Sequence, residues 1–205
     1  AAVSRGMRKG AILEPAETAV SIKEAMDSLF KSTGIMPADI YVGLGGYNCL
    51  SFQKSKGVVA ISRADGEVTK EDQKRAVEAS ETGLSRLQNK VILHRIPLNF
   101  RVDGEAPAPD AVGLRGIKLE GEVLFITASS QCLNNALSAL EGAGVDWKEV
   151  VAGPLALADS LLGKREKETG VLLIDLGASS TSVAVFDEGL PYSLEVLPVG
   201  SAHIT

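Results

Sequence analysis

The chain has 205 residues, of which 45% are apolar and 23% are charged, and its formal net charge is −5; these are the proportions of an ordinary globular protein. No cluster of Lys and Arg is long enough to follow a nucleic-acid backbone, which argues against a nucleic acid as partner. No apolar run approaches the roughly 20 residues that cross a bilayer, and no apolar segment follows the basic start of the chain to make a signal peptide.

The two cysteines, Cys49 and Cys132, are isolated in the sequence and lack the spacing of a metal site. We therefore predict two reduced, packed thiols in a cytosolic protein rather than a disulfide. The chain begins with Ala1 rather than Met, and residues 1–12 read as a strand or hairpin with nothing before it to pair with. The last residues stop just after a strand pattern, so we expect a piece of a longer protein.

The first long element is an amphipathic helix that begins at Pro15, a residue suited to the first turn, and ends at Gly34. A short apolar strand follows within 40–46. The apolar face of the helix recurs at spacings of three and four residues, through Ala19, Ile22, Met26, Leu29 and Phe30.

The next region is rich in strand patterns. Residues 47–68 alternate around Gly57 and predict two antiparallel strands. Thr69 and Asp72 have the spacing of a capping box and predict a helix that ends near Leu87. Further strands are expected over 90–103, where Pro97 indicates an edge position or a bulge, and over 116–129, with a proline-rich loop between them.

After Ser130 the helical spacing returns. We predict a helix that ends at Gly142 to Gly144, a short strand, a second helix from Pro154, a charged link, and finally three strands at 171–176, 181–187 and 192–198. Strands and helices thus alternate at both ends of the chain around a β-rich middle, which predicts an α/β core interrupted by an insertion.

The turn after the strand 171–176 carries the one recognisable chemical pattern. Asp175 ends an apolar strand, and only small residues follow, from Gly177 through Ala178 and Ser179 to Ser180. The backbone N–H groups of such a turn can bind a phosphate, and Asp175 could hold Mg²⁺ through water. A hairpin that needs small residues only for its twist explains the pattern equally well, so the residues alone leave both interpretations open.

Several stretches spread over nearly the whole chain form a recognisable series. They are SRGMRKG (4–10), IYVGLGG (40–46), GVVAIS (57–62), EVTKED (67–72), VILHRIPLNFRVD (91–103), VGLRGIKLEGEVLFIT (112–127), AGPLALADSLL (152–162) and residues 170–205. In their order and their residues, these stretches resemble the FtsA family of bacterial actin-like cell-division proteins. The most specific pair is H-x-I-P followed by V-G-L-x-G, because ordinary actins and their chaperone relatives lack that region.

The resemblance implies an actin-like ATPase core of the ribonuclease H-like type, α/β in class, with an α+β insertion. Residues 1–46 and 129–165 would form part of subdomain 1A. Residues 47–128 would be the inserted SHS2-type subdomain 1C, and residues 166–205 would begin subdomain 2A.

The resemblance also implies that the turn at Asp175, Gly177, Ala178, Ser179 and Ser180 is the second phosphate loop of an ATP site, with Mg²⁺ held by Asp175 through water. Where the family often has two glycines and an acid, this chain has Ala178, Ser179 and Ser182. If those positions need positive φ, the substitutions cost free energy. We expect ATP and Mg²⁺ to bind in the full-length protein, with at most weak ATPase activity, and no tight binding or catalysis by this piece.

The partners implied are further copies of the protein, through filament contacts of 1C, and other division proteins. FtsZ would bind only through subdomain 2B, and the membrane only through a C-terminal helix, both absent here. The location implied is the cytoplasmic face of the membrane at the septum. Rivals are a PilM-like pilus-assembly protein and a sugar or acetate kinase of the same superfamily.

Four other features are not assigned to this site. His94 and His203 have no partner that predicts catalysis, and Trp147 reads as a core or rim aromatic. The glycines at 43, 45 and 46 have no helix directly behind them, so we expect no dinucleotide site there.

Overall fold

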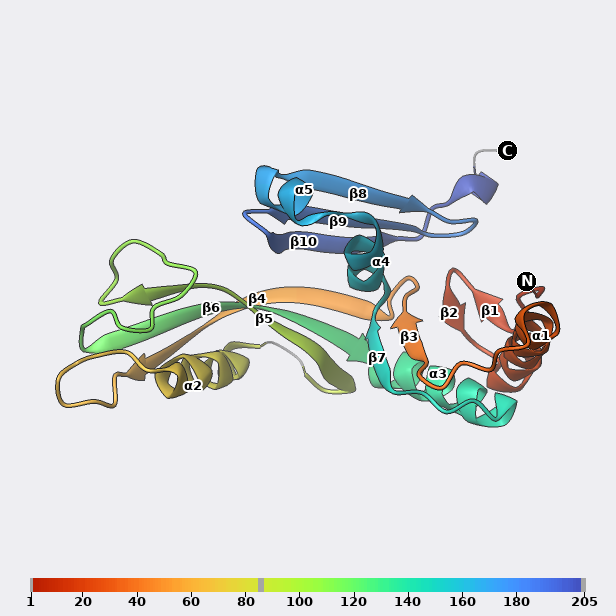
Figure 1. Cartoon of the computed structure of the whole chain (residues 1–205), viewed down its shortest axis with the longest axis horizontal. Coiled ribbons are helices and arrows are strands. Elements are labelled where there is room, and N and C mark those ends of the chain that lie inside the picture. Colours follow the sequence, from red (N-terminus) through yellow and green to blue (C-terminus); the bar gives the residue numbers. More distant parts are fainter. Residues whose placement is uncertain (1, 85–86, 204–205) are drawn as a thin grey trace. The chain divides into compact units, whose positions relative to one another are not determined.

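The computed structural model describes residues 2–84 and 87–203. The chain divides into two compact units (Figure 1): unit 1 comprises Ala1–Ser51 and Ala128–Thr205, and unit 2 comprises Phe52–Thr127. Unit 2 is therefore an insertion in the sequence of unit 1, and each unit is described by itself below.

Unit 1 begins with a tight hairpin of β1 (Met7–Arg8) and β2 (Ala11–Ile12). Its two turn residues, Lys9 and Gly10, both have positive φ, of 51° and 75°, which is the conformation of a type I′ turn. The predicted first helix is confirmed as α1 (Pro15–Thr33), and it ends at Gly34 in the left-handed conformation.

The middle of unit 1 is a parallel strand pair with helices beside it. β3 (Tyr41–Leu44) pairs in parallel with β7 (Glu149–Ala152). Between them in the sequence of unit 1 lies α3 (Ser130–Ala143), which packs against α1. After β7 the chain turns directly into α4 (Gly153–Leu161), so the carboxyl ends of both strands lie close to the start of this helix.

The last part of unit 1 is an antiparallel sheet in the order β10-β9-β8. Its strands are β8 (Val171–Leu176), β9 (Thr181–Asp187) and β10 (Leu190–Leu197), close to the three predicted ranges. The charged segment before them, predicted as a link, is a short helix, α5 (Lys164–Thr169), and a 3₁₀ turn, η2 (Ser201–His203), follows the sheet.

Unit 2 is a three-stranded sheet in the order β4-β6-β5 with one helix packed against it. The strands are β4 (Leu50–Ala60), β5 (Lys90–Val102) and β6 (Lys118–Ser129). The helix is α2 (Lys70–Ser80), followed by the 3₁₀ turn η1 (Glu81–Gly83). β5 is an edge strand, as Pro97 indicated.

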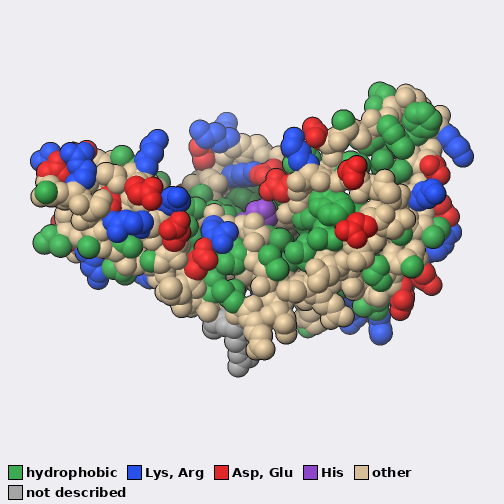
Figure 2. All heavy atoms as spheres, turned by 90° about the horizontal axis from the view of Figure 1, so that it is seen from below, with side chains coloured by type: hydrophobic (Ala, Val, Ile, Leu, Met, Phe, Trp, Pro, Cys, Tyr) green, Lys and Arg blue, Asp and Glu red, His purple; other side chains and the backbone are tan. Residues whose placement is uncertain are grey.

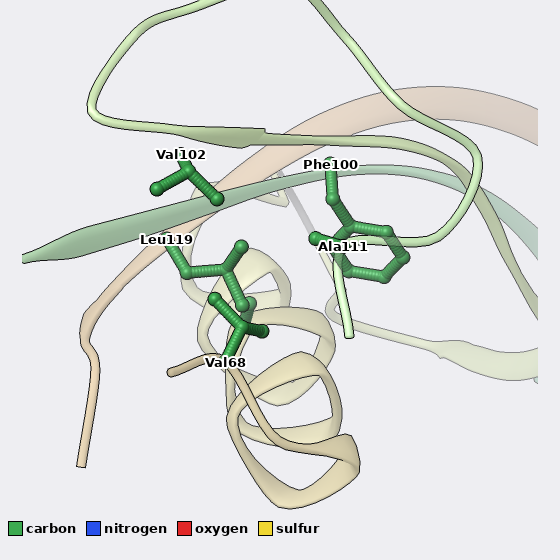
Figure 3. Packing of buried hydrophobic residues seen from close by; sticks show 6 residues of the cluster. Val68, Phe100, Val102, Ala111 and Leu119 are labelled. Carbon is green, nitrogen blue, oxygen red and sulfur yellow. The ribbon is translucent and has the colours of Figure 1, made fainter. Parts of the chain in front are cut away.

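A compact apolar cluster lies between this sheet and α2 (Figure 3). Phe100 and Leu119 contribute the largest side chains, and both are buried; each contributes roughly 2 kcal/mol on leaving water. The full cluster is Val68, Ala76, Phe100, Val102, Ala111 and Leu119. Unit 2 therefore has a core of its own.

Two sequence predictions for unit 2 are wrong. Residues 50–60 form one continuous strand rather than two, because Gly57 does not turn the chain but lets the backbone of α2 approach β4. The helix after Thr69 ends at Ser80 rather than near Leu87, because the chain tightens there into η1. Part of the predicted helix end, residues 85–86, lies outside the described residues.

The prediction of two free thiols is also wrong. Cys49 and Cys132 form a disulfide, with their Cα atoms 5.6 Å apart. The backbone explains why they meet, because the Ser129 N–H donates to the Cys49 carbonyl oxygen at 2.8 Å and so holds the start of β4 beside the start of α3. This proximity arises from long-range pairing that the spacing of the cysteines does not reveal.

Candidate functional site

The Asp175 turn joins β8 to β9. Asp175 pairs with Ser182 and Leu176 with Thr181 in the strand register, so residues 177–180 close a tight hairpin. The Gly177 N–H donates to the Ser180 carbonyl oxygen at 3.0 Å and fixes the turn. The small residues singled out in the sequence are therefore the whole of this turn.

Ala178 and Ser179 are not among the residues with positive φ. A side chain at either position thus costs no left-handed strain. The sequence alone left open whether Ala178 and Ser179, in place of the family's glycines, cost free energy. The backbone of the turn accommodates both side chains without that cost.

A neighbouring segment holds the carbonyl side of the turn. The N–H groups of Ser201 and Ala202 donate to the carbonyl oxygens of Gly177 and Ala178, each at 2.9 Å. Gly200 makes this approach possible, since a Cβ there would lie 2.5 Å from the Gly177 oxygen. In the described part of the chain, no hydrogen bond engages the backbone N–H groups of Ala178, Ser179 and Ser180, which leaves three donors for an anion.

The turn borders an open cavity of about 520 Å³ in unit 1. Glycine and other small residues make up most of its lining, so a ligand can approach the backbone closely. The lining residues are Gly10, Gly43, Gly45, Gly46, Gly153, Pro154, Ala156, Leu157, Ser160, Asp175, Ser180 and Ser182. Of the predicted site residues, Asp175 and Ser180 line the cavity, whereas Gly177, Ala178 and Ser179 lie in the adjoining turn.

From the sequence, Gly43, Gly45 and Gly46 are considered only for a dinucleotide site, which is rejected, and Gly10 and Gly153 are not singled out as site residues; all five line this cavity. Gly46 packs directly against the β1–β2 turn, since a Cβ on Gly46 would lie 2.6 Å from the Gly10 carbonyl oxygen. Gly153 starts α4 at the end of β7, beside the residues that follow β3. A usable signal was the pair of short parallel strands, because ligands of α/β sheets bind beyond the carboxyl ends of such strands. No helix follows Gly43, Gly45 and Gly46 directly in the sequence. The helix beside them in the structure is α4, which lies over 100 residues later in the chain.

Asp175 is the one charged residue in the cavity lining, and its side chain is exposed. The described residues contain no group of three or more His, Cys, Asp and Glu side chains able to hold a metal ion. A single carboxylate fits Mg²⁺, which usually keeps several waters and takes its other ligands from phosphate groups. The site can thus accept a magnesium–phosphate complex but has no protein cage for a bare ion.

The other candidates lie elsewhere. His94 lies in β5 of unit 2, and Trp147 is half-buried just before β7; neither lines the cavity. His203 lies in η2, where its Nδ1 is 3.1 Å from the Gly200 nitrogen. None of these three residues therefore belongs to the candidate site.

The surface of the molecule is mixed in charge. Over the face that Figure 2 shows, Lys and Arg side chains are interspersed with Asp and Glu, as is usual for a solvated surface. Among the described helices, none combines the length and the apolar character needed to span a membrane.

Unit 2 also carries exposed apolar side chains on the loop that precedes β6. Val112, Leu114 and Ile117 are 40%, 46% and 80% exposed. Groups of exposed apolar residues are typical of surfaces that contact other proteins.

Comparison with known proteins agrees with this arrangement. Residues 48–127 match the family model of the SHS2 domain inserted in FtsA. The cell division protein FtsA of Bacillus subtilis (strain 168) is 37% identical over 98% of this chain and 46% of its own length. That of Borreliella burgdorferi is 34% identical over 99% of this chain and 49% of its own length. The chain thus spans about half the length of these curated relatives.

A solved structure of the PilM–PilN type IV pilus biogenesis complex is similar in fold. The superposition on one chain of that complex covers 98% of the present chain and 54% of the chain of the complex, with a TM-score of 0.66 and 20% sequence identity. The predicted fold class, an α/β actin-like core with an inserted SHS2 domain, is thereby confirmed. Over nearly all of its residues, the chain is thus similar to FtsA cell division proteins, and its middle part matches the SHS2 domain inserted in them.

Proposed function

We propose that this chain is the part of an FtsA-type cell-division protein that contributes one side of an ATP site and the SHS2 interaction module. Residues 1–46 and 129–165 belong to subdomain 1A, residues 47–128 are subdomain 1C, and residues 166–205 begin subdomain 2A. In the whole protein, ATP with Mg²⁺ binds at the Asp175 turn, and the protein assembles into filaments, attaches the FtsZ ring to the membrane at the septum and recruits later division proteins.

One observation carries the nucleotide proposal: the turn 177–180 presents three uncommitted N–H donors beside a glycine-lined cavity that also contains the Asp175 carboxylate. Phosphate oxygens need several donors and close access to the backbone, and Mg²⁺ needs a carboxylate nearby. The lining contains no Lys or Arg. Neutralisation of the phosphates therefore depends on the backbone, the metal ion and parts of the whole protein outside this chain.

Only the likeness in fold, at 20% sequence identity, supports the PilM-like alternative. The relatives at 34% and 37% identity are cell division proteins, so we propose the division role first. Binding of the chain to a pilus-assembly partner in place of division proteins would reverse this order.

A titration of the isotope-labelled chain with ATP and Mg²⁺, followed by NMR, tests the site. We expect binding weaker than micromolar, with the largest shifts at the amides of Ala178, Ser179 and Ser180. Asp175→Asn should remove the dependence of binding on Mg²⁺, whereas Asp187→Asn, an exposed acid at the far end of β9, should not. Shifts confined to unit 2, submicromolar affinity, or equal behaviour of the two variants would contradict the proposal.

Self-association tests the role of the SHS2 module. We expect sedimentation of the chain to show association that disappears when residues 52–127 are replaced by a short Gly-Ser linker. A short linker suffices, because the Cys49 oxygen and the Ser129 nitrogen are 2.8 Å apart. Ile117→Ser should weaken association without unfolding unit 2, since Ile117 is 80% exposed, and Val91→Ser in β5 serves as its control. Unchanged association after the replacement would exclude contacts through the module, and a peptide of the FtsZ C-terminus should not bind.

A further inference from the structure

The disulfide occupies a special position in the chain. Cys49 immediately precedes β4 and is 1% exposed, whereas Cys132 lies in the first turn of α3 and is half-buried. The two residues are 83 positions apart, and all of unit 2 lies in the sequence between them. Both cysteines belong to unit 1, so the bond fastens the two ends of the insertion to each other.

Noncovalent contacts also hold the two ends together, because β4 and β6 are hydrogen-bonded neighbours in the sheet of unit 2. The Ser129 N–H bond to the Cys49 oxygen joins the two ends, and Leu50 beside it is buried. A cross-link that closes a long loop removes much conformational freedom from the unfolded chain. The disulfide therefore adds a covalent constraint to the hydrogen bonds that hold these two ends.

The surroundings of the sulfurs differ in a way that suits thiol–disulfide exchange. Cys132 is within reach of solvent and near the N–H groups at the start of the 14-residue α3, a setting that favours a thiolate. Cys49 is shielded from solvent and is bonded to the sulfur of Cys132. This is the arrangement of an accessible reactive cysteine with a buried resolving partner.

We propose that Cys49 and Cys132 form a reversible thiol–disulfide site that responds to small dithiols and disulfides and controls how firmly the ends of the SHS2 insertion are held. In reduction, a dithiol thiolate attacks the Cys132 sulfur, the S–S bond breaks, and the Cys49 sulfur leaves with the electron pair and takes up a proton. The second thiol of the reagent then releases Cys132 as a thiol, and the reagent becomes the cyclic disulfide. A small disulfide reverses both steps.

The site is tested by alkylation of the purified chain before and after dithiothreitol, carried out in denaturant so that the buried Cys49 is accessible, with peptide mass spectrometry. We expect a linked peptide pair that contains Cys49 and Cys132 after air or oxidised glutathione, and complete alkylation of both after dithiothreitol. Under partial reduction, the mixed disulfide should form at Cys132. Alkylation of both cysteines after oxidised glutathione treatment would overturn the proposal and restore the prediction of two packed thiols.

The melting temperature and amide hydrogen exchange show whether the disulfide constrains the two ends of the insertion. The oxidised chain should melt on the order of 10 °C above the reduced chain, and the double variant Cys49→Ala, Cys132→Ala should be indifferent to dithiothreitol. Reduction should speed amide exchange at 49–51 and 128–132 while α2 keeps its protection. Equal melting of the oxidised and reduced chains, or faster exchange in α2 alone, would contradict a role at these ends.

Discussion

Gly57→Ala is expected to prevent unit 2 from packing, with a loss of about 3 kcal/mol or more in the free energy of unfolding. Gly57 lies in the middle of β4, where the backbone of α2 touches the strand. A Cβ at this position would lie 2.1 Å from the Ala76 carbonyl oxygen, 2.3 Å from the Ser80 nitrogen and 2.9 Å from the Ala79 carbonyl carbon. All three are backbone atoms, so no side-chain rotation relieves the overlap, and the helix itself must move.

Urea unfolding followed by circular dichroism and by the amide signals of α2 measures this loss. Gly45→Ala is the matched control, because Gly45 has no positive φ and a Cβ there meets nothing within 4 Å. The control should stay within about 0.5 kcal/mol of the original chain. If Gly57→Ala were as stable as the control, close contact between α2 and β4 would not be the reason for glycine at this position.

Short-range sequence signals correctly predicted those features that depend only on neighbouring residues, such as helix ends and an edge strand. The capping box at Thr69 and Asp72 marks the start of α2, and Gly34 ends α1 in the left-handed conformation. Pro97 indicated an edge strand, which β5 is. In each case the cause lies within a few residues of the signal, so a single sequence contains it.

Features that depend on distant parts of the chain were not predictable in this way. Gly57 looks like a turn glycine in its own strand, and its real constraint is the backbone of α2. The disulfide depends on the return of the chain from unit 2, and the cavity glycines meet because β3 pairs with β7, over 100 residues later. The pattern at 175–180 predicted a tight turn of small residues. The cavity beside it could not be predicted from those residues, because most of its lining comes from other parts of the chain.

The second large effect is expected from a substitution of Asp72, because its carboxylate is buried in a network of hydrogen bonds. Its side chain is fully buried, and it accepts hydrogen bonds from the Ser62 N–H at 3.1 Å, from the Thr69 N–H at 2.9 Å and from the Thr69 hydroxyl at 2.7 Å. Arg75 adds a charged hydrogen bond. The Asp72 carboxylate therefore joins the segment just after β4 to the start of α2, in addition to capping the helix.

Asp72→Asn is expected to cost about 2 to 4 kcal/mol at neutral pH, because an amide cannot accept all four hydrogen bonds and carries no charge to meet Arg75. Glu71→Gln is the matched control: Glu71 is an exposed acid in the same first turn, and its loss should cost no more than about 0.5 kcal/mol. Urea unfolding of the two variants measures the difference. A loss for Asp72→Asn no larger than that of Glu71→Gln would show that the buried network contributes little.

The same carboxylate predicts how unit 2 responds to acid. Burial by itself would raise the pKa of Asp72, but the hydrogen bonds from Thr69, Arg75 and Ser62 outweigh it and hold the pKa well below its usual value. Since the folded pKa is lower than the unfolded one, the folded protein binds fewer protons, and the stabilisation is complete above the unfolded pKa of about 3.9. It is lost progressively as the pH falls below that value toward the folded pKa. The free energy of unfolding of the original chain should therefore fall more steeply than that of Asp72→Asn as the pH drops below about 4, and parallel slopes would assign the acid sensitivity to other groups.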